Sequence, residues 1–170
     1  MSVVIVGTLD TKGAEIGFAR DVLQAQGVDV YVVDTGVVGE PGIDPDTPAS
    51  DVAEAAGTTL EHLREEADRG EAMTAMGEGA TAIAQRMYDE GDLDGIMGLG
   101  GSGNTSIATT AMRALPVGVP KLMVSTMASG DTEPYVGARD IMMLYSVADI
   151  EGLNQLSRQV IANAALAMEG

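Results

Sequence analysis

The chain has 170 residues, of which 45% are hydrophobic and 3% aromatic, with 26 acidic residues, nine basic residues and no cysteine. This predicts one domain with an aliphatic core, and it excludes disulfides and thiolate metal sites. The net charge of −17 argues against binding to nucleic acid or to an anionic membrane. Without a signal-peptide pattern or a membrane-spanning apolar run, a cytoplasmic protein is expected. The acidic, lysine-poor composition also indicates a host with high internal salt, where repulsion between carboxylates is screened.

Short apolar runs alternate with longer helical patterns along the chain. Helices are predicted after the first strand as far as Gly27, after the third strand, and over 148–168 with a start near Asn154. This alternation predicts an α/β fold: a Rossmann-like, doubly wound, mostly parallel five-stranded sheet with helices on both faces. The five predicted strands are residues 3–9, 28–36, 94–100, 119–126 and 140–146.

The connection between the second and third strands is unusually long. Residues 37–49 contain three prolines and predict a loop. Residues 50–91 predict helices, interrupted at Gly57, Gly70 and the Gly77–Gly79 pair. A lid over a site and an oligomer interface explain this excursion equally well. No linker divides the chain, so residues 1–170 are predicted to form a single domain.

The loop after the third strand carries the sharpest local signal for function. Its glycines allow a ligand to approach the backbone closely, and the helix that follows adds free N–H groups and a positive dipole. These features favour an anion-binding loop over a simple tight turn. The sequence is neither a Walker A motif nor a clean dinucleotide fingerprint. The residues concerned are Gly100, Gly101 and Gly103, with Ser102, Asn104 and Thr105 as side-chain donors.

The loop after the first strand contains Lys12, one of only two lysines. A lysine at a helix start opposes the helix dipole, which favours a phosphate nearby, although pairing with Asp10 or Glu15 explains it equally well. Asp10 could cap this helix or hold a ligand hydroxyl or Mg²⁺. Asp34, at the end of the second strand, fits either an acceptor for a ribose hydroxyl or an Asx-type turn.

Residues 125–132 follow the fourth strand and supply four hydroxyl groups, Gly130 and Asp131. The carboxyl ends of parallel strands meet at one edge of a sheet, and ligands bind there where the strand order reverses. Four polar loops at this edge predict a shared pocket for a small anion, with a nucleotide phosphate favoured.

The segments GTLDTKG, GLGGSGNTS, STMASGDT and YSVADIEGLN occur in this order and span nearly the whole chain. Together they resemble the Tm-1-like ATP-binding domain, the N-terminal half of an uncharacterised family that includes the tomato mosaic virus resistance protein. The resemblance implies ATP binding and assembly into dimers or larger homo-oligomers. It implies ligand contacts from Thr8, Asp10, Thr11 and Lys12, phosphate contacts from Gly101, Ser102, Gly103 and Thr105, and a further wall of Thr126, Ser129, Gly130 and Thr132.

Members of that family usually continue into a second, barrel-like half, so the chain is expected to be a truncated form or to work with a separate second-half protein. Three functional hypotheses follow. The first is a nucleotide-binding module, with ATP favoured and Mg²⁺ optional. The second is a Mg²⁺-dependent enzyme that hydrolyses ATP or transfers its phosphoryl group, although no nucleophile with an adjacent base can be assigned. The third is a regulatory or structural subunit that uses residues 37–91 as its contact surface.

Overall fold

The computed structural model describes all 170 residues and contains one five-stranded sheet with strand order β2-β1-β3-β4-β5. Every strand pair is parallel, which confirms the predicted fold class. Each predicted strand is present: β1 begins one residue earlier than predicted, and every other bound lies at the predicted residue or one or two residues inside it. The strands are β1 (Ser2–Gly7), β2 (Asp29–Asp34), β3 (Gly95–Gly100), β4 (Lys121–Ser125) and β5 (Met142–Tyr145).

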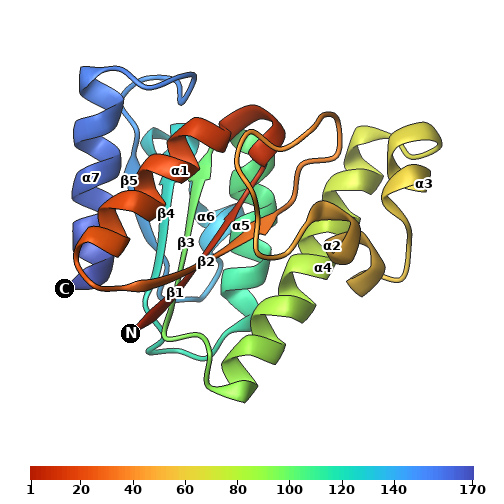
Figure 1. The fold of residues 1–170 in the computed structure, drawn as a ribbon, viewed down its shortest axis with the longest axis horizontal. Coiled ribbons are helices and arrows are strands. Elements are labelled where there is room, and N and C mark those ends of the chain that lie inside the picture. The colour runs from red at the N-terminus through yellow and green to blue at the C-terminus, as the bar shows by residue number, and fades with distance from the viewer.

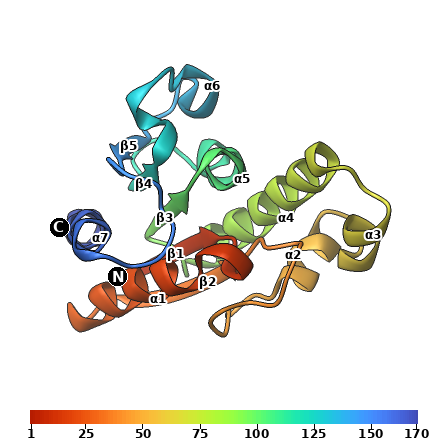
Figure 2. The same cartoon turned by 90° about the horizontal axis from the view of Figure 1, so that it is seen from above.

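Helices cover both faces of the sheet, as Figures 1 and 2 show. One face carries α1 (Leu9–Ala25) and α7 (Gln155–Glu169), and the other carries α4 (Arg69–Glu90) and α5 (Ser102–Ala114). Beyond α4 lie α2 (Ala49–Ala55) and α3 (Leu60–Glu65). A 3-10 turn, η1 (Thr126–Ser129), and the short α6 (Glu133–Val136) separate β4 from β5. No helix, including the 22-residue α4, combines the length and apolarity needed to cross a bilayer.

The sheet divides the core into two apolar layers. Val4 and Val6 of β1 pack in the layer beneath α4 and α5, whereas Val3 and Ile5 pack in the layer beneath α1 and α7. Successive side chains of a strand point to opposite faces, so a strand buried on both sides needs an unbroken apolar run. This is why the central strands were recognisable from the sequence.

The predicted helix breaks at Gly70 and at Gly77–Gly79 are wrong. Helix α4 runs without interruption across all three glycines, and the true break falls just before Asp68, whose carboxylate caps α4 by accepting a hydrogen bond from the Glu71 N–H at 2.8 Å. Gly79 serves close packing instead, because a Cβ there would lie 2.0 Å from the Val52 carbonyl oxygen of α2. The predicted break at Gly57 is confirmed, with a φ of +79° immediately after α2.

The long excursion between β2 and β3 contributes to the core. Met76 and Met87 are buried in the core layer beneath α4 and α5, so they are not available for the contact surface that the third hypothesis places in residues 37–91. Before α2, the chain folds back along β2: Thr47 N–H donates to the Val32 carbonyl at 3.0 Å, and Asp34 N–H donates to the Thr47 carbonyl at 2.9 Å. The excursion therefore covers the outer edge of β2.

Candidate ligand-binding site

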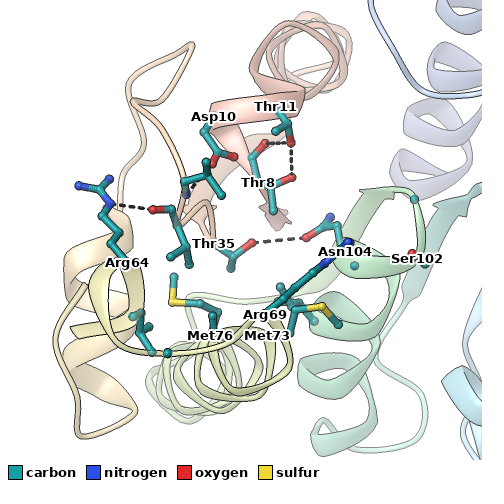
Figure 3. Close-up of a pocket in the computed structure, with 18 of the residues that line it drawn as sticks. Thr8, Asp10, Thr11, Thr35, Arg64, Arg69, Met73, Met76, Ser102 and Asn104 are labelled. Carbon is teal, nitrogen blue, oxygen red and sulfur yellow. Dashed lines mark hydrogen bonds between the residues drawn. The ribbon is translucent and has the colours of Figure 1, made fainter. Parts of the chain in front are cut away.

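A cavity of about 720 Å³ lies beyond the carboxyl ends of β1 and β3. The chain leaves β1 toward β2 on one side and reaches β3 on the other, so this is where the strand order reverses and where open α/β sheets bind ligands. Its volume is within the range of small-molecule sites. Figure 3 shows that residues of α1, of the loop after β2, of α3 and α4, and of α5 converge around it.

One wall of the cavity is apolar and comes mainly from the excursion and α4. Part of the excursion therefore lines the cavity, and the lid and the oligomer interface both stay predictions. A wall of this kind accepts a flat, weakly polar group by removing its surface from water. The apolar lining residues are Val37, Val38, Leu63, Ala67, Ala72, Met73, Met76 and Ile107.

The facing wall is the start of α5. Gly101 is its N-cap residue and supplies no capping side chain, and the first turn contains no acidic residue. By contrast, Asp68 caps α4 and Asn154 caps α7. Ser102 and Gly103, the first residues of α5, line the cavity, and their N–H groups have no side-chain acceptor. Such a terminus offers several donors and a positive dipole to an anion.

Gly100 and Asn104 hold this turn in place. Gly100 has a φ of +154°, and a Cβ there would lie 2.9 Å from the Cβ of Asn104. The buried amide of Asn104 donates to the carbonyls of Val6 at 3.2 Å and Leu99 at 2.8 Å, and it accepts from the Thr35 hydroxyl at 3.4 Å. One side chain thus joins the ends of β1, β2 and β3 beneath the cavity.

At the start of α1, Thr8 and Thr11 line the cavity with hydroxyl groups 2.9 Å apart. Lys12 also lines it, and its φ of −126° and ψ of 20° interrupt the first turn of α1. The ion pairs of the structure do not include Lys12, so the expected alternatives of pairing with Asp10 or Glu15 are not what the structure shows.

Asp10 and Arg64 position the loop after β2. The Asp10 carboxylate accepts hydrogen bonds from Val38 N–H at 3.0 Å and Gly39 N–H at 3.1 Å. Arg64 donates from Nε to the Val37 carbonyl at 2.6 Å, a contact drawn in Figure 3. The second carboxylate oxygen of Asp10, Oδ1, is buried and has no hydrogen-bond partner. Asp10 therefore orders the cavity wall and keeps one acceptor unused.

Asp34 lies behind the cavity and does not line it. Its Oδ1 accepts from Gly36 N–H at 2.8 Å, which forms the Asx-type turn, and from Leu9 N–H at 3.1 Å at the start of α1. Burial raises the pKa of the Asp34 carboxyl above its usual 3.8, although the two N–H donors oppose this change. Asp34 connects β2 to α1.

The loop after β4 lies outside the cavity. Thr105 is fully buried, and its hydroxyl lies 2.7 Å from that of Ser125, which connects the glycine loop to the end of β4. In this loop Thr126 lies beside the glycines: a Cβ atom added at Gly101 would be 3.7 Å from the Thr126 Oγ1. The cavity therefore brings together eight of the sequence-predicted site residues and leaves eight outside it. Those inside are Thr8, Asp10, Thr11, Lys12, Gly101, Ser102, Gly103 and Asn104, and those outside are Asp34, Gly100, Thr105, Thr126, Ser129, Gly130, Asp131 and Thr132.

Two arginines that the sequence reasoning missed complete the site. Arg64 and Arg69 both line the cavity. Arg69 lies at the glycine loop, because a Cβ atom added at Gly103 would be 3.5 Å from the Arg69 Nη2. Neither forms an ion pair with a carboxylate. The sequence signal that could have found these arginines is the scarcity of basic residues: the chain has only nine, and three of them line this cavity.

The family model of the UPF0261 N-terminal domain, an uncharacterised protein family, matches residues 1–170. The chain belongs to the UPF0261 family. A UPF0261 protein of Clostridium tetani is 51% identical over 168 residues, which are 99% of this chain and 42% of that protein. The tomato protein named ToMV susceptible protein tm-1(GCR26) is 43% identical over 102 residues, which are 60% of this chain and 14% of the tomato protein.

These matches confirm the resemblance drawn from the motifs at the level of the family. The UPF0261 domain described here spans about two fifths of the length of the Clostridium relative. Among solved structures, Drosophila melanogaster DJ-1beta aligns with 98% of this chain and 87% of that chain, with a TM-score of 0.45 and 16% identity. A likeness of that size says nothing about function.

Carboxylate side chains are few around the cavity of this UPF0261 domain. No group of three or more histidine or carboxylate side chains is placed to hold a metal ion. The only carboxylates in the lining belong to Asp10 and Asp68, and both accept backbone hydrogen bonds. The donor set consists of amides, hydroxyls and cations, which suits an anionic ligand.

Proposed function

We propose that this domain binds a nucleotide, with ATP favoured, and that the phosphates lie between the start of α5 and the cations of the cavity. One observation carries the proposal: Lys12, Arg64 and Arg69, none of them paired with a carboxylate, line a single cavity in a chain of net charge −17. Arg64 also donates to the Val37 and Gly39 carbonyls, which leaves Lys12 and Arg69 as the cations with no hydrogen-bond partner of their own. A bound anion would supply the missing acceptors.

In this proposal, the wall at the start of α5 contacts the phosphates and the apolar wall contacts the base. The N–H groups of Ser102 and Gly103, with Arg69 and Lys12 nearby, would hold phosphate oxygens. The apolar wall that includes Met73 and Met76 would receive the base. The hydroxyls of Thr8 and Thr11 would donate to phosphate or ribose oxygens. The same arrangement supports binding better than catalysis, because the hydroxyls of the lining have no histidine beside them and its two carboxylates, Asp10 and Asp68, accept backbone hydrogen bonds.

Calorimetric titration with ATP, ADP and inorganic phosphate, at low and high salt and with and without Mg²⁺, tests the proposal. Arg69→Ala and Lys12→Ala are each expected to weaken ATP binding about tenfold, or ~1.4 kcal/mol, and added salt should weaken binding by the parent chain. Arg86→Ala is the matched control, because Arg86 lies on the same helix as Arg69, is exposed and is absent from the cavity.

Gly101→Val provides a steric test of the same site. A Cβ at Gly101 meets nothing closer than 3.7 Å, so the variant should fold, while its branched side chain stands at the start of α5. Loss of ATP binding in Gly101→Val with unchanged thermal unfolding would support the assignment. Equal ATP affinity in Gly101→Val, Arg69→Ala and the parent chain would rule this cavity out as the phosphate site.

A further inference from the structure

The opposite end of the domain carries a surface with almost no charge. Residues 141–148 contain no charged residue, and residues 152–168 contain only Arg158, in a chain where 21% of residues are charged. These two segments form β5 and α7, which lie side by side at the end farthest from α3 (Figures 1 and 2). We call this surface the β5–α7 face.

The β5–α7 face exposes large apolar side chains. Met142 and Tyr145 of β5 are 49% and 41% exposed, and Leu156 and Leu166 of α7 are each 43% exposed. Met142 pairs with Leu122 and lies on the α7 side of the sheet, whereas Tyr145 pairs with Ser125 and lies on the α5 side, so the two side chains flank the outer edge of β5. The exposed charges of this region are Asp149 and Glu151 in the loop between β5 and α7, and Arg158 on α7. Single exposed apolar residues are ordinary, but large ones along a strand edge and the neighbouring helix indicate an interaction surface. Depletion of charge with enrichment in methionine and aromatic side chains is the composition of a protein–protein interface core.

The two edges of the sheet are treated differently. The outer edge of β2 is covered by the returning segment at Asp46 and Thr47, which is hydrogen-bonded to Val32. The order of the sheet ends at β5 on the other side, and no segment of the chain pairs with its outer edge. An exposed strand edge without charged side chains invites further pairing or packing, so proteins normally cover or charge it.

The relatives identify what could cover this face. The family model describes an N-terminal domain, and more than half of the Clostridium relative lies outside the matched 168 residues. Helix α7 forms part of the face and ends at Glu169, at the end of the molecule away from the cavity (Figure 1). A chain that continues beyond Gly170 therefore leaves from the border of the face itself.

We propose that the β5–α7 face is the docking surface for the C-terminal part of the longer family proteins, which packs on the open edge of β5 and on the outer side of α7. The contact is apolar and uncharged, so it is insensitive to the salt that weakens anion binding in the cavity. The proposal does not depend on the ligand, because the cavity and this face lie at opposite ends of the domain.

Oxidative footprinting of two chains tests the proposal. The first is the 170-residue domain, which contains both of its core layers. The second is the same domain followed by the C-terminal part of the Clostridium relative. Side-chain labelling follows exposure, so Tyr145 is expected to be labelled roughly fivefold less in the longer chain, as it passes from 41% exposed to buried. Tyr88 of α4 is the matched control, because it is 38% exposed on a different helix and should be labelled equally in both chains.

The full-length Clostridium relative gives a second measurement on a natural protein. Amides of its segment aligned with residues 141–147 should exchange with deuterium more slowly in the full chain than in its N-terminal part alone. Equal labelling of Tyr145 in both footprinted chains, or equal exchange in both forms of the relative, would overturn the proposal. Protection of Tyr145 that grows with concentration in the 170-residue domain would assign the face to a second copy, and would also overturn it.

Discussion

The two ends of the domain differ in the way they use charge. Seven of the fourteen residues 60–73, which form α3 and the start of α4, carry charged side chains, whereas only three of the 28 residues 141–168 do. The charged end places Arg64 and Arg69 at a cavity, and the uncharged end places Met142 and Tyr145 in solvent. The first composition suits the proposed anion site, and the second suits the proposed docking surface.

The two lysines of the chain illustrate the same contrast. Lys12 lines the cavity and has no carboxylate partner, while Lys121 of β4 is fully buried near the start of β5. The Lys121 ammonium donates to the carbonyls of Pro116 and Val119 and, at 2.9 Å, to the Asp140 carboxylate. An unpaired cation is available for a ligand, and one whose hydrogen bonds are satisfied belongs to the structure.

The largest expected effect is on the free energy of unfolding, and it distinguishes the two lysines. Lys121→Ala should lower the free energy of unfolding by about 3 kcal/mol, because it removes three charge-assisted hydrogen bonds and leaves buried carbonyls without donors. Lys12→Ala should change it by less than about 0.5 kcal/mol while weakening ATP binding. Urea denaturation monitored by circular dichroism measures both, and a stability loss in Lys12→Ala equal to that in Lys121→Ala would remove the distinction.

Asn104→Ala comes next in size, at about 2 kcal/mol of lost stability, because the carbonyls of Val6 and Leu99 lose their donor. The variant should also bind ATP more weakly, since the start of α5 is no longer tied to β1. Asn163→Ala, on the exposed side of α7, serves as the control and should match the parent chain in both assays. Denaturation and calorimetry on the three proteins would expose a failure of either expectation.

The pH dependence of stability should have opposite sign at Asp140 and at Asp34. Hydrogen bonds from Gly118 N–H and from Lys121 hold the pKa of Asp140 at about 2. A carboxyl with a lowered folded-state pKa stabilises the fold above its unfolded pKa near 4, and that contribution is lost as the pH falls toward 2. Asp140→Asn should therefore lose stability at neutral pH and approach the parent chain in acid.

Burial raises the pKa of Asp34, so the folded state favours its protonated form. Its contribution to stability is therefore greatest below pH 3.8 and falls as the pH rises through the raised folded-state value. Asp34→Asn keeps an acceptor for Leu9 and Gly36 and removes the buried charge, so it should equal or exceed the parent chain in stability at neutral pH. Thermal melts between acid and neutral pH compare the two variants, and parallel profiles for both would contradict the assigned causes.

The smallest effect is expected on the β5–α7 face. Leu166→Lys should leave the stability of the 170-residue domain within about 0.5 kcal/mol, because the side chain is already half in solvent and packs against no core layer. The same change in the longer chain should loosen the C-terminal part, seen as faster proteolysis. A loss above about 1 kcal/mol in the short domain would mean that Leu166 belongs to the domain's own core.

Several elements could be predicted because their signal is local. The apolar runs of β1 and β3, the glycine at the end of α1 and the capping of α7 by Asn154 each follow from neighbouring residues in the sequence. The break proposed at Gly79 failed for a tertiary reason: a glycine that weakens an isolated helix also lets a second helix approach, and α2 supplies that helix. Gly70 is not a break because it lies in the first turn of α4, just after the Asp68 cap.

The sequence by itself determined the fold class, the family and the glycine loop at the cavity, because periodicity, turn residues and ordered motifs are written along the chain. Only the tertiary structure decided which loops meet. Arg64 and Arg69 lie far along the chain from Lys12, and the excursion between β2 and β3 carries them to the same cavity, whereas the loop after β4 stays outside it. The uncharged face likewise arises because β5 and α7, each unremarkable alone, become neighbours at the uncovered edge of the sheet.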